Sequence, residues 1–179
     1  MSAASQFRRS ALVLLVLLVS AAAPDRVVAS ATATNQKDFE LVGFELLAAF
    51  NYVPPSYETM VPGAPPASAE AAPKNQIPDY VRELDAKKIS ITGFMLPTKF
   101  KNGKVTEFLL MKDQSGCCFG AMPRINEWII VRMMQGGIPP LMDIPLTLLG
   151  KLKVGELYEE GYLSGIYQLE GEQLLDVKG

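Results

Sequence analysis

The sequence predicts a mainly β protein, a small antiparallel OB-like barrel or a rolled sheet of five or six strands with a short N-terminal helix. Three observations support this fold class. Short apolar segments separated by turn residues recur from residue 89 onward, as in small all-β proteins. Asn102-Gly103 is a strong hairpin turn, because both residue types tolerate the positive φ of a type I′ turn. Glycines lie in or beside the strands, where a small barrel bends; these are Gly93, Gly150, Gly155 and Gly165.

The N-terminal residues have the pattern of an export signal. Arg8 and Arg9 precede an apolar run over residues 11–23, and small residues follow it. This run is shorter than the roughly 20 residues that span a bilayer. We therefore expect residues 1–29 to be a cleaved signal peptide, with no integral membrane span left after cleavage. The expected location is the periplasm or cell envelope of a bacterium, and an uncleaved N-terminal anchor is the alternative.

The next two segments connect the signal to a compact domain. Residues 30–52 form an N-terminal segment in which the apolar stretch 38–50 predicts a short helix that packs on the domain. Residues 53–76 are rich in proline and alanine, which is typical of an extended linker. The domain itself is predicted to cover residues 77–179.

Within the domain the pattern changes from helix to strand. Pro78 suits the first position of a helix, so residues 78–84 predict one or two helical turns. Apolar residues then alternate with small or polar ones between turn residues. The predicted strands are residues 89–95, 105–111, 127–133, 144–154, 162–169 and 173–177. Glu170-Gly171-Glu172 is the second hairpin candidate, and residues 136–140 break the chain between the third and fourth strands.

The charge balance argues against nucleic acid as a partner. The chain has 17 basic and 19 acidic residues. Removing residues 1–29 leaves 14 basic and 18 acidic residues, a net charge of −4. Nucleic-acid affinity depends largely on Lys and Arg contacts with phosphate, and a mildly acidic chain is poorly suited to it.

Cys117 and Cys118 are the chemically unusual residues. With no histidine in the chain, Ser-His-Asp and Cys-His catalysis and His-ligated metals are excluded. Adjacent Cα atoms lie about 3.8 Å apart, below the roughly 4.4–6.8 Å of a relaxed disulfide, so a bond between the two thiols would be strained and easily reduced. Three interpretations stay open: small structural residues in a tight loop, a redox switch, or a soft-metal site for copper as Cu(I). Met122 and Met95 are the nearest thioether candidates for such a site.

The residues around the cysteines suggest a ligand-binding rim. Arg124 and Asn126 follow the loop and could orient a ligand, or else cap the loop carbonyls. Asp113 precedes the loop, and Trp128 is one of several aromatic residues that line a face or fill the core. We find no nucleophile with its base and no carboxylate dyad, and therefore assign no catalytic residue. A non-enzymatic binding or accessory protein is favoured, with a Cu(I) or thiol-disulfide redox protein as the alternative.

Several motifs together resemble a known family. They are Ile77-Pro-Asp-Tyr-Val-Arg-Glu-Leu-Asp85, Lys88-Ile-Ser-Ile-Thr-Gly-Phe-Met-Leu-Pro97, the run from Val105 through Cys117-Cys118 to Gly120, Pro123-Arg-Ile-Asn-Glu-Trp128 and Gly161-Tyr-Leu-Ser-Gly-Ile-Tyr-Gln-Leu-Glu-Gly171. This set is similar to the exported bacterial proteins of domain-of-unknown-function family 3299. The resemblance implies a periplasmic or envelope protein of uncharacterised activity. It also implies an envelope protein partner, such as an ABC-type export system, because some relatives resemble partners of such systems.

Overall fold

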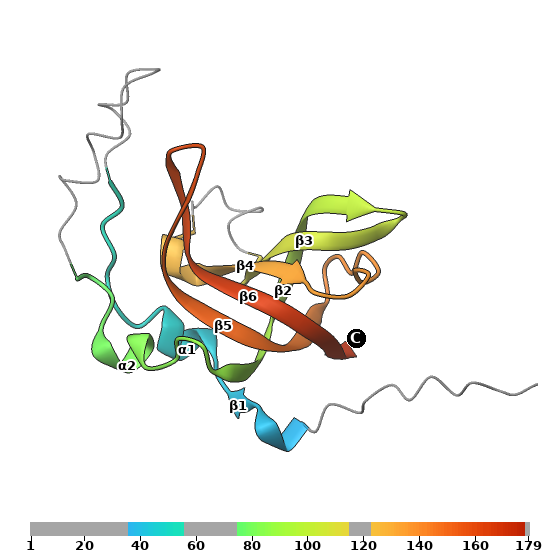
Figure 1. The fold of residues 1–179 in the computed structure, drawn as a ribbon, viewed down its shortest axis with the longest axis horizontal. Coiled ribbons are helices and arrows are strands. Elements are labelled where there is room, and N and C mark those ends of the chain that lie inside the picture. Colours follow the sequence, from blue (N-terminus) through green and yellow to red (C-terminus); the bar gives the residue numbers. More distant parts are fainter. Residues whose placement is uncertain (1–35, 56–74, 115–122, 178–179) are drawn as a thin grey trace, which may run out of the picture. The chain divides into compact units, whose positions relative to one another are not determined.

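The computed structural model describes residues 36–55, 75–114 and 123–177 (Figure 1). The elements in chain order are η1 (Gln36–Asp38), β1 (Glu40–Leu41), α1 (Phe44–Leu47), α2 (Asp79–Arg82), β2 (Lys88–Lys101), β3 (Lys104–Met111), η4 (Ile125–Glu127), β4 (Trp128–Met133), β5 (Pro145–Glu159) and β6 (Tyr162–Val177). The prediction of a mainly β protein is confirmed. The predicted signal peptide, Cys117, Cys118 and Met122 lie outside the described residues.

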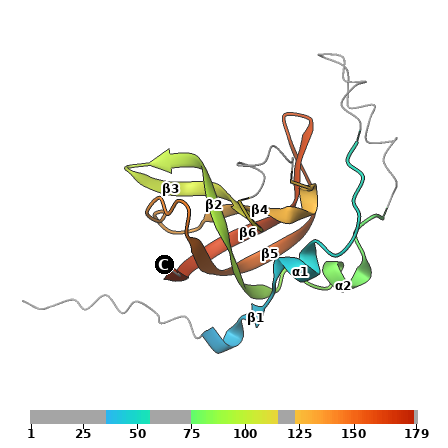
Figure 2. The same ribbon diagram turned by 180° about the vertical axis from the view of Figure 1, so that it is seen from behind.

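Five of the six strands form a closed ring of hydrogen-bonded pairs. β2 pairs antiparallel with β3 and with β5, β3 with β4, and β5 with β6, while β4 and β6 are parallel. β1 adds to β2 as a short parallel strand. The arrangement is barrel-like, as expected for an OB-like chain, but the sheet is mixed rather than purely antiparallel. Figure 2 shows β2 running from its pairing with β5 into the projecting hairpin with β3.

Gly93 and Gly150 are needed where strands approach closely. A Cβ atom on Gly93 would lie 2.6 Å from the carbonyl oxygen of Met111, at the point where β2 changes from one neighbour to the next. A Cβ atom on Gly150 would lie 2.5 Å from the carbonyl oxygen of Glu170, beside a register shift between β5 and β6. Gly150 therefore lies at a strand irregularity of the kind that the sequence predicted, whereas Gly93 is required by a close backbone approach.

One predicted hairpin is confirmed and one is wrong. Asn102 and Gly103 have φ of 52° and 75° and join β2 to β3. Glu170-Gly171-Glu172 is not a turn but part of β6, and the turn between β5 and β6 lies at Glu160-Gly161. The physical reason is packing, because a Cβ atom on Gly171 would lie 2.7 Å from the sulfur of Met133.

The N-terminal segment is less helical than its apolar pattern suggested. Only Phe44–Leu47 is α-helical within the predicted range 38–50. Residues 40–42 instead use their backbone groups at the edge of β2, where the amide of Val42 donates to Ser90 O at 3.0 Å. Phe44, Leu47 and Tyr52 join the same buried cluster as Phe108 and Tyr167 from the ring. The segment is therefore part of the core.

Candidate functional site

A small pocket opens where β2 parts from β5. The two strands pair as far as Phe94 opposite Pro145, and beyond this point β2 pairs with β3 among the described strands. The pocket has a volume of about 120 Å³. Its lining residues come from β2, from the end of β3 and from the segment before β5; they are Phe94, Met95, Leu96, Met111, Asp113, Gln114, Met142 and Asp143. We call this the Met pocket.

The Met pocket combines three thioethers with a polar mouth. Met95 and Met111 are buried, whereas Met142 is 51% exposed. Gln114 donates through Nε2 to Asp143 Oδ1 at 3.0 Å, which fixes one carboxylate beside the opening. Asp113 is the second acidic residue of the lining. The apolar wall can take an apolar group or a soft cation, and the carboxylates of Asp113 and Asp143 are part of the lining.

Two of the residues predicted from sequence meet in this pocket. Met95 and Asp113 both line it. Met111 and Met142 were missed, because they lie on separate segments and only the strand pairing brings them together. Trp128 pairs with Met111 across β3 and β4 but does not line the pocket. Its indole Nε1 donates to Ser164 O at 3.2 Å.

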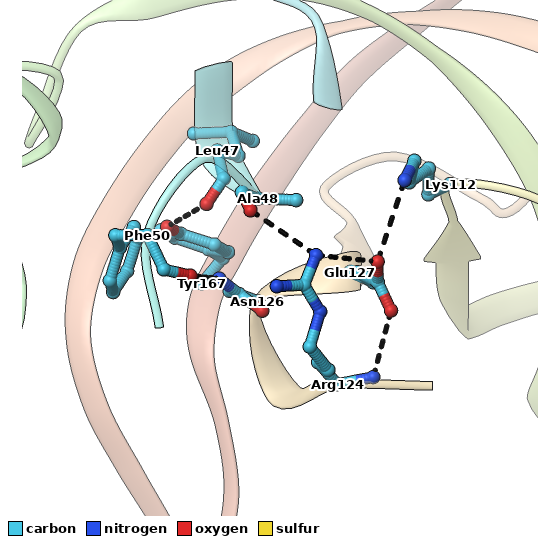
Figure 3. Close-up of polar contacts among 8 residues, drawn as sticks. All are labelled: Leu47, Ala48, Phe50, Lys112, Arg124, Asn126, Glu127 and Tyr167. Atoms are coloured by element: carbon cyan, nitrogen blue, oxygen red, sulfur yellow. Dashed lines mark hydrogen bonds and ion pairs between the residues drawn. The ribbon is translucent and has the colours of Figure 1, made fainter. Parts of the chain in front are cut away.

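Arg124 and Asn126 hold the N-terminal segment (Figure 3). Asn126 donates through Nδ2 to Phe50 O at 2.7 Å, and Arg124 donates through Nη2 to Ala48 O at 3.3 Å. Tyr167 adds a third bond, from its hydroxyl to Leu47 O at 2.9 Å. Carbonyls at and after the end of a helix have no partner within the helix. In the described structure these side chains therefore bind carbonyls at and after the end of α1.

We call Arg124, Asn126 and Tyr167 with their three carbonyl partners the clasp. Glu127 supports the clasp electrostatically. Its carboxylate accepts from Arg124 Nη2 and from the Arg124 amide, both at 2.9 Å, and lies 3.4 Å from Lys112 Nζ (Figure 3). The hydrogen bond from the Arg124 side chain lowers the pKa of Glu127 and outweighs the opposing effect of burial. The same contact raises the pKa of Arg124. Both groups therefore stay charged around neutral pH.

Asn126 is fully buried, and only one of its two polar side-chain atoms has a hydrogen-bond partner among the described residues. Its Nδ2 has Phe50 O as a partner, but its Oδ1 has no hydrogen-bond partner among the described residues. An unsatisfied buried polar atom typically costs about 1–3 kcal/mol. The bond to Phe50 O therefore determines where the Asn126 side chain lies, although its Oδ1 is left without a hydrogen bond.

A line of charges crosses the outer face of the ring. Glu107 lies between Lys99 Nζ at 2.8 Å and Arg132 Nε at 2.9 Å, and Arg132 continues to Glu159 through Nη2 at 2.6 Å. Burial on its own would raise the pKa of Glu107, but the hydrogen bonds and charges of Lys99 and Arg132 lower it overall. This line joins β2, β3, β4 and β5 and is a structural feature of the ring.

The described ranges contain neither a cluster of typical metal ligands nor a membrane-spanning helix. No group of three or more His, Cys, Asp or Glu side chains in these ranges is placed to hold a metal ion. Within the same ranges, no helix is both long and apolar enough to cross a membrane. Thioether groups such as that of the Met pocket form a separate kind of site.

The described structure thus defines a small mainly β protein with a Met-lined pocket at the edge of a five-stranded ring. Residues 58–176 match the family of proteins of unknown function DUF3299, and the chain belongs to that family. The crystal structure of a DUF3299 family protein from Pseudomonas aeruginosa PAO1 is similar, with a TM-score of 0.51 and 19% identity over 79% of this chain and 99% of that chain. At this identity the likeness shows the fold alone. No curated protein shows a significant match.

Proposed function

We propose that the chain is an exported, non-enzymatic accessory protein of the bacterial cell envelope. The Met pocket would receive one apolar group of its ligand or partner, and the loop of Cys117 and Cys118, which follows Gln114 in the chain, would form the rim. The observation that supports this proposal is the pocket itself, an apolar hollow with a few converging polar groups. Such a hollow is the usual form of a binding site.

The size of the pocket favours a small group over a large ligand. Sites for drug-sized molecules measure about 300–1,000 Å³, whereas an apolar cavity of about 150 Å³ takes up benzene. The Met pocket, at about 120 Å³, is nearer the second case. Its occupant would therefore be one side chain or the end of a ligand. An envelope protein, such as an ABC-type export system, is the partner class that the family resemblance implies.

The pocket is tested with toluene, which has the shape of a phenylalanine side chain. In the full chain labelled with ¹³C at the methionine methyls, we expect saturable shifts for Met95, Met111 and Met142. The methyl of Met134, which is exposed outside the pocket, is the internal control. Met142→Trp should fill the mouth and abolish the shifts, whereas Met134→Trp should not. Uniform, non-saturating shifts of all methionines would contradict the proposal.

Export is tested separately from the pocket. Protein recovered from the periplasmic fraction should have the mass of a chain that lacks residues 1–29. Retention of the full mass in the cytoplasm would remove the export part of the proposal and leave the pocket binding intact.

A soft-metal protein is the second candidate function, favoured by the three thioethers that line one pocket. Thioether and thiolate sulfur select Cu(I), and Ag(I) is its redox-inert substitute. In a Cys117→Ser/Cys118→Ser chain, Ag(I) should shift the three pocket methionine methyls and leave Met134 unchanged. Absence of these shifts would rule out the thioether site.

The thiol-disulfide alternative is tested by mass. A chain purified without reductant that is two hydrogens lighter than the reduced chain would support a redox pair. Two alkylatable thiols would exclude it.

A further inference from the structure

The tip of the β2–β3 hairpin carries positive charge that the described structure does not neutralise. We define the hairpin tip as Phe100, Lys101, Asn102, Gly103 and Lys104. Lys101 and Lys104 lie directly opposite each other in the register of β2 and β3. Like charges in this arrangement destabilise a sheet. Lys99, just before the tip, has Glu107 at 2.8 Å, but neither Lys101 nor Lys104 has an ion-pair partner among the described residues.

Glu107 is the acidic residue of the hairpin, and Lys99 and Arg132 already neutralise it. Residues 88–106 include four lysines and no Asp or Glu. The segment after β4 packs against the hairpin, because Val105 and Ile138 form a bridge and a Cβ atom on Gly137 would lie 3.1 Å from Lys104 Cβ. Residues 134–141 of this segment carry no charged side chain at all. The unpaired lysines therefore serve no visible purpose in folding.

An exposed aromatic ring lies between these charges. Phe100 is 60% exposed, next to Lys101, although its register partner Val105 is fully buried. The turn residues Asn102 and Gly103 hold the tip in a defined type I′ geometry. The hairpin projects from the ring (Figure 1). A preformed, protruding tip thus presents one aromatic ring and two amines together.

We infer that the hairpin tip docks the protein onto a bilayer surface of anionic lipid. The ring of Phe100 would enter the interface, and the stems of Lys101 and Lys104 would reach headgroup phosphates. Each lysine near an anionic surface strengthens binding about fivefold. A five-residue tip is small compared with the 20–30 residues per side of a standard protein interface, which favours lipid over an acidic protein. This inference uses no residue of the Met pocket.

The test places a tryptophan at the tip of the full chain. The native chain has a single tryptophan, Trp128, which provides the background signal. Phe100→Trp is mixed with vesicles of phosphatidylcholine and phosphatidylglycerol that carry brominated acyl chains, which quench tryptophan at the interface. Leu41→Trp is the matched control, because Leu41 is 80% exposed in β1, away from the hairpin. The readout is local to residue 100, so membrane contacts made by other parts of the chain do not mimic it.

We expect strong quenching for Phe100→Trp and background quenching for the native chain and Leu41→Trp. Adding Lys101→Gln and Lys104→Gln to Phe100→Trp should raise the lipid concentration for half-maximal quenching about 25-fold, and vesicles without phosphatidylglycerol should quench little. Equal quenching at residues 41 and 100, or no effect of the lysine changes, would overturn the inference. So would binding of soluble polyglutamate at the tip without lipid quenching, which would indicate an acidic protein partner. Co-sedimentation of a Lys101→Gln/Lys104→Gln chain that retains Phe100 checks the charge dependence independently.

Discussion

Removal of one hydroxyl group should loosen the N-terminal segment. Tyr167 is fully buried, and its hydroxyl donates to Leu47 O across 120 positions of the chain. Burial raises the pKa of Tyr167, so this hydroxyl remains a donor through the usual pH range. Tyr167→Phe keeps the ring and leaves no cavity of ring size. The loss is therefore the hydrogen bond and the satisfaction of the Leu47 carbonyl.

The magnitude follows from these two terms. Leaving a buried acceptor unsatisfied costs about 1–3 kcal/mol. For a protein of this size, 1 kcal/mol shifts the melting temperature by about 2–4 °C, so Tyr167→Phe should lower it by roughly 2–12 °C. Urea unfolding followed by Trp128 fluorescence measures the free energy, and amide exchange at Ala48 and Ala49 reports the segment itself.

Tyr80→Phe is the matched control, because Tyr80 is 43% exposed. We expect a change within about 0.5 kcal/mol for this control, as for most surface substitutions. If Tyr167→Phe were no more destabilising than Tyr80→Phe, and if exchange at Ala48 and Ala49 were unchanged, the reasoning about the clasp would be refuted.

Three further predictions concern the ring and its charges. Gly93→Ala places a Cβ atom 2.6 Å from Met111 O, so thermal unfolding should show a loss of about 1–3 kcal/mol; an unchanged melting temperature would contradict the close approach. The pKa of Glu127 is lowered from 4.5 in the folded chain, so its contribution is present above that value and lost as pH falls through the folded pKa. Urea curves should therefore show the stability gap between the native chain and Glu127→Gln narrowing as the pH falls below 4.5, and a constant gap would argue against it. Glu107→Gln removes the negative charge between Lys99 and Arg132 and replaces one of the two acceptor oxygens with an amide donor, so it should destabilise by about 1–2 kcal/mol. Glu172→Gln, which breaks one long exposed ion pair, should change stability by less than about 1 kcal/mol.

Local signals in the sequence predicted some elements and misjudged others. Asn102-Gly103 was correctly identified, because its backbone requirement is a property of those two residues. Gly171 was wrongly predicted to be a turn residue. Glycine is needed there because a Cβ atom would collide with Met133 on a neighbouring strand. That neighbour comes from a parallel pairing of β4 and β6, which no local pattern reveals.

The candidate site divides in the same way. Asp113 was found because it precedes the cysteine loop in sequence, and Met95 because the predicted hairpin places the end of its strand beside the strand that leads into the loop. Met142 carries no local signal, and only the register of β2, β3 and β5 brings it to one pocket with Met111. Arg124 and Asn126 were predicted to orient a ligand or to cap carbonyls of the cysteine loop. Their partners, the carbonyls of Ala48 and Phe50, lie 76 positions away and could not be inferred.

The long reach of the clasp also sets the order in which the chain can fold. Residues 47–50 are synthesised early, but the hydrogen bond from Tyr167 to Leu47 O can form only after β6 has been synthesised. The ring itself closes only when β5 returns to β2, with Lys88 opposite Lys151. Pairings this distant in sequence are slow to form, because the entropy of closing the intervening loop is lost before the contacts between the strands can stabilise the pair. A chain that lacks β6 cannot close the ring, so the native state becomes accessible only after β6 has been synthesised.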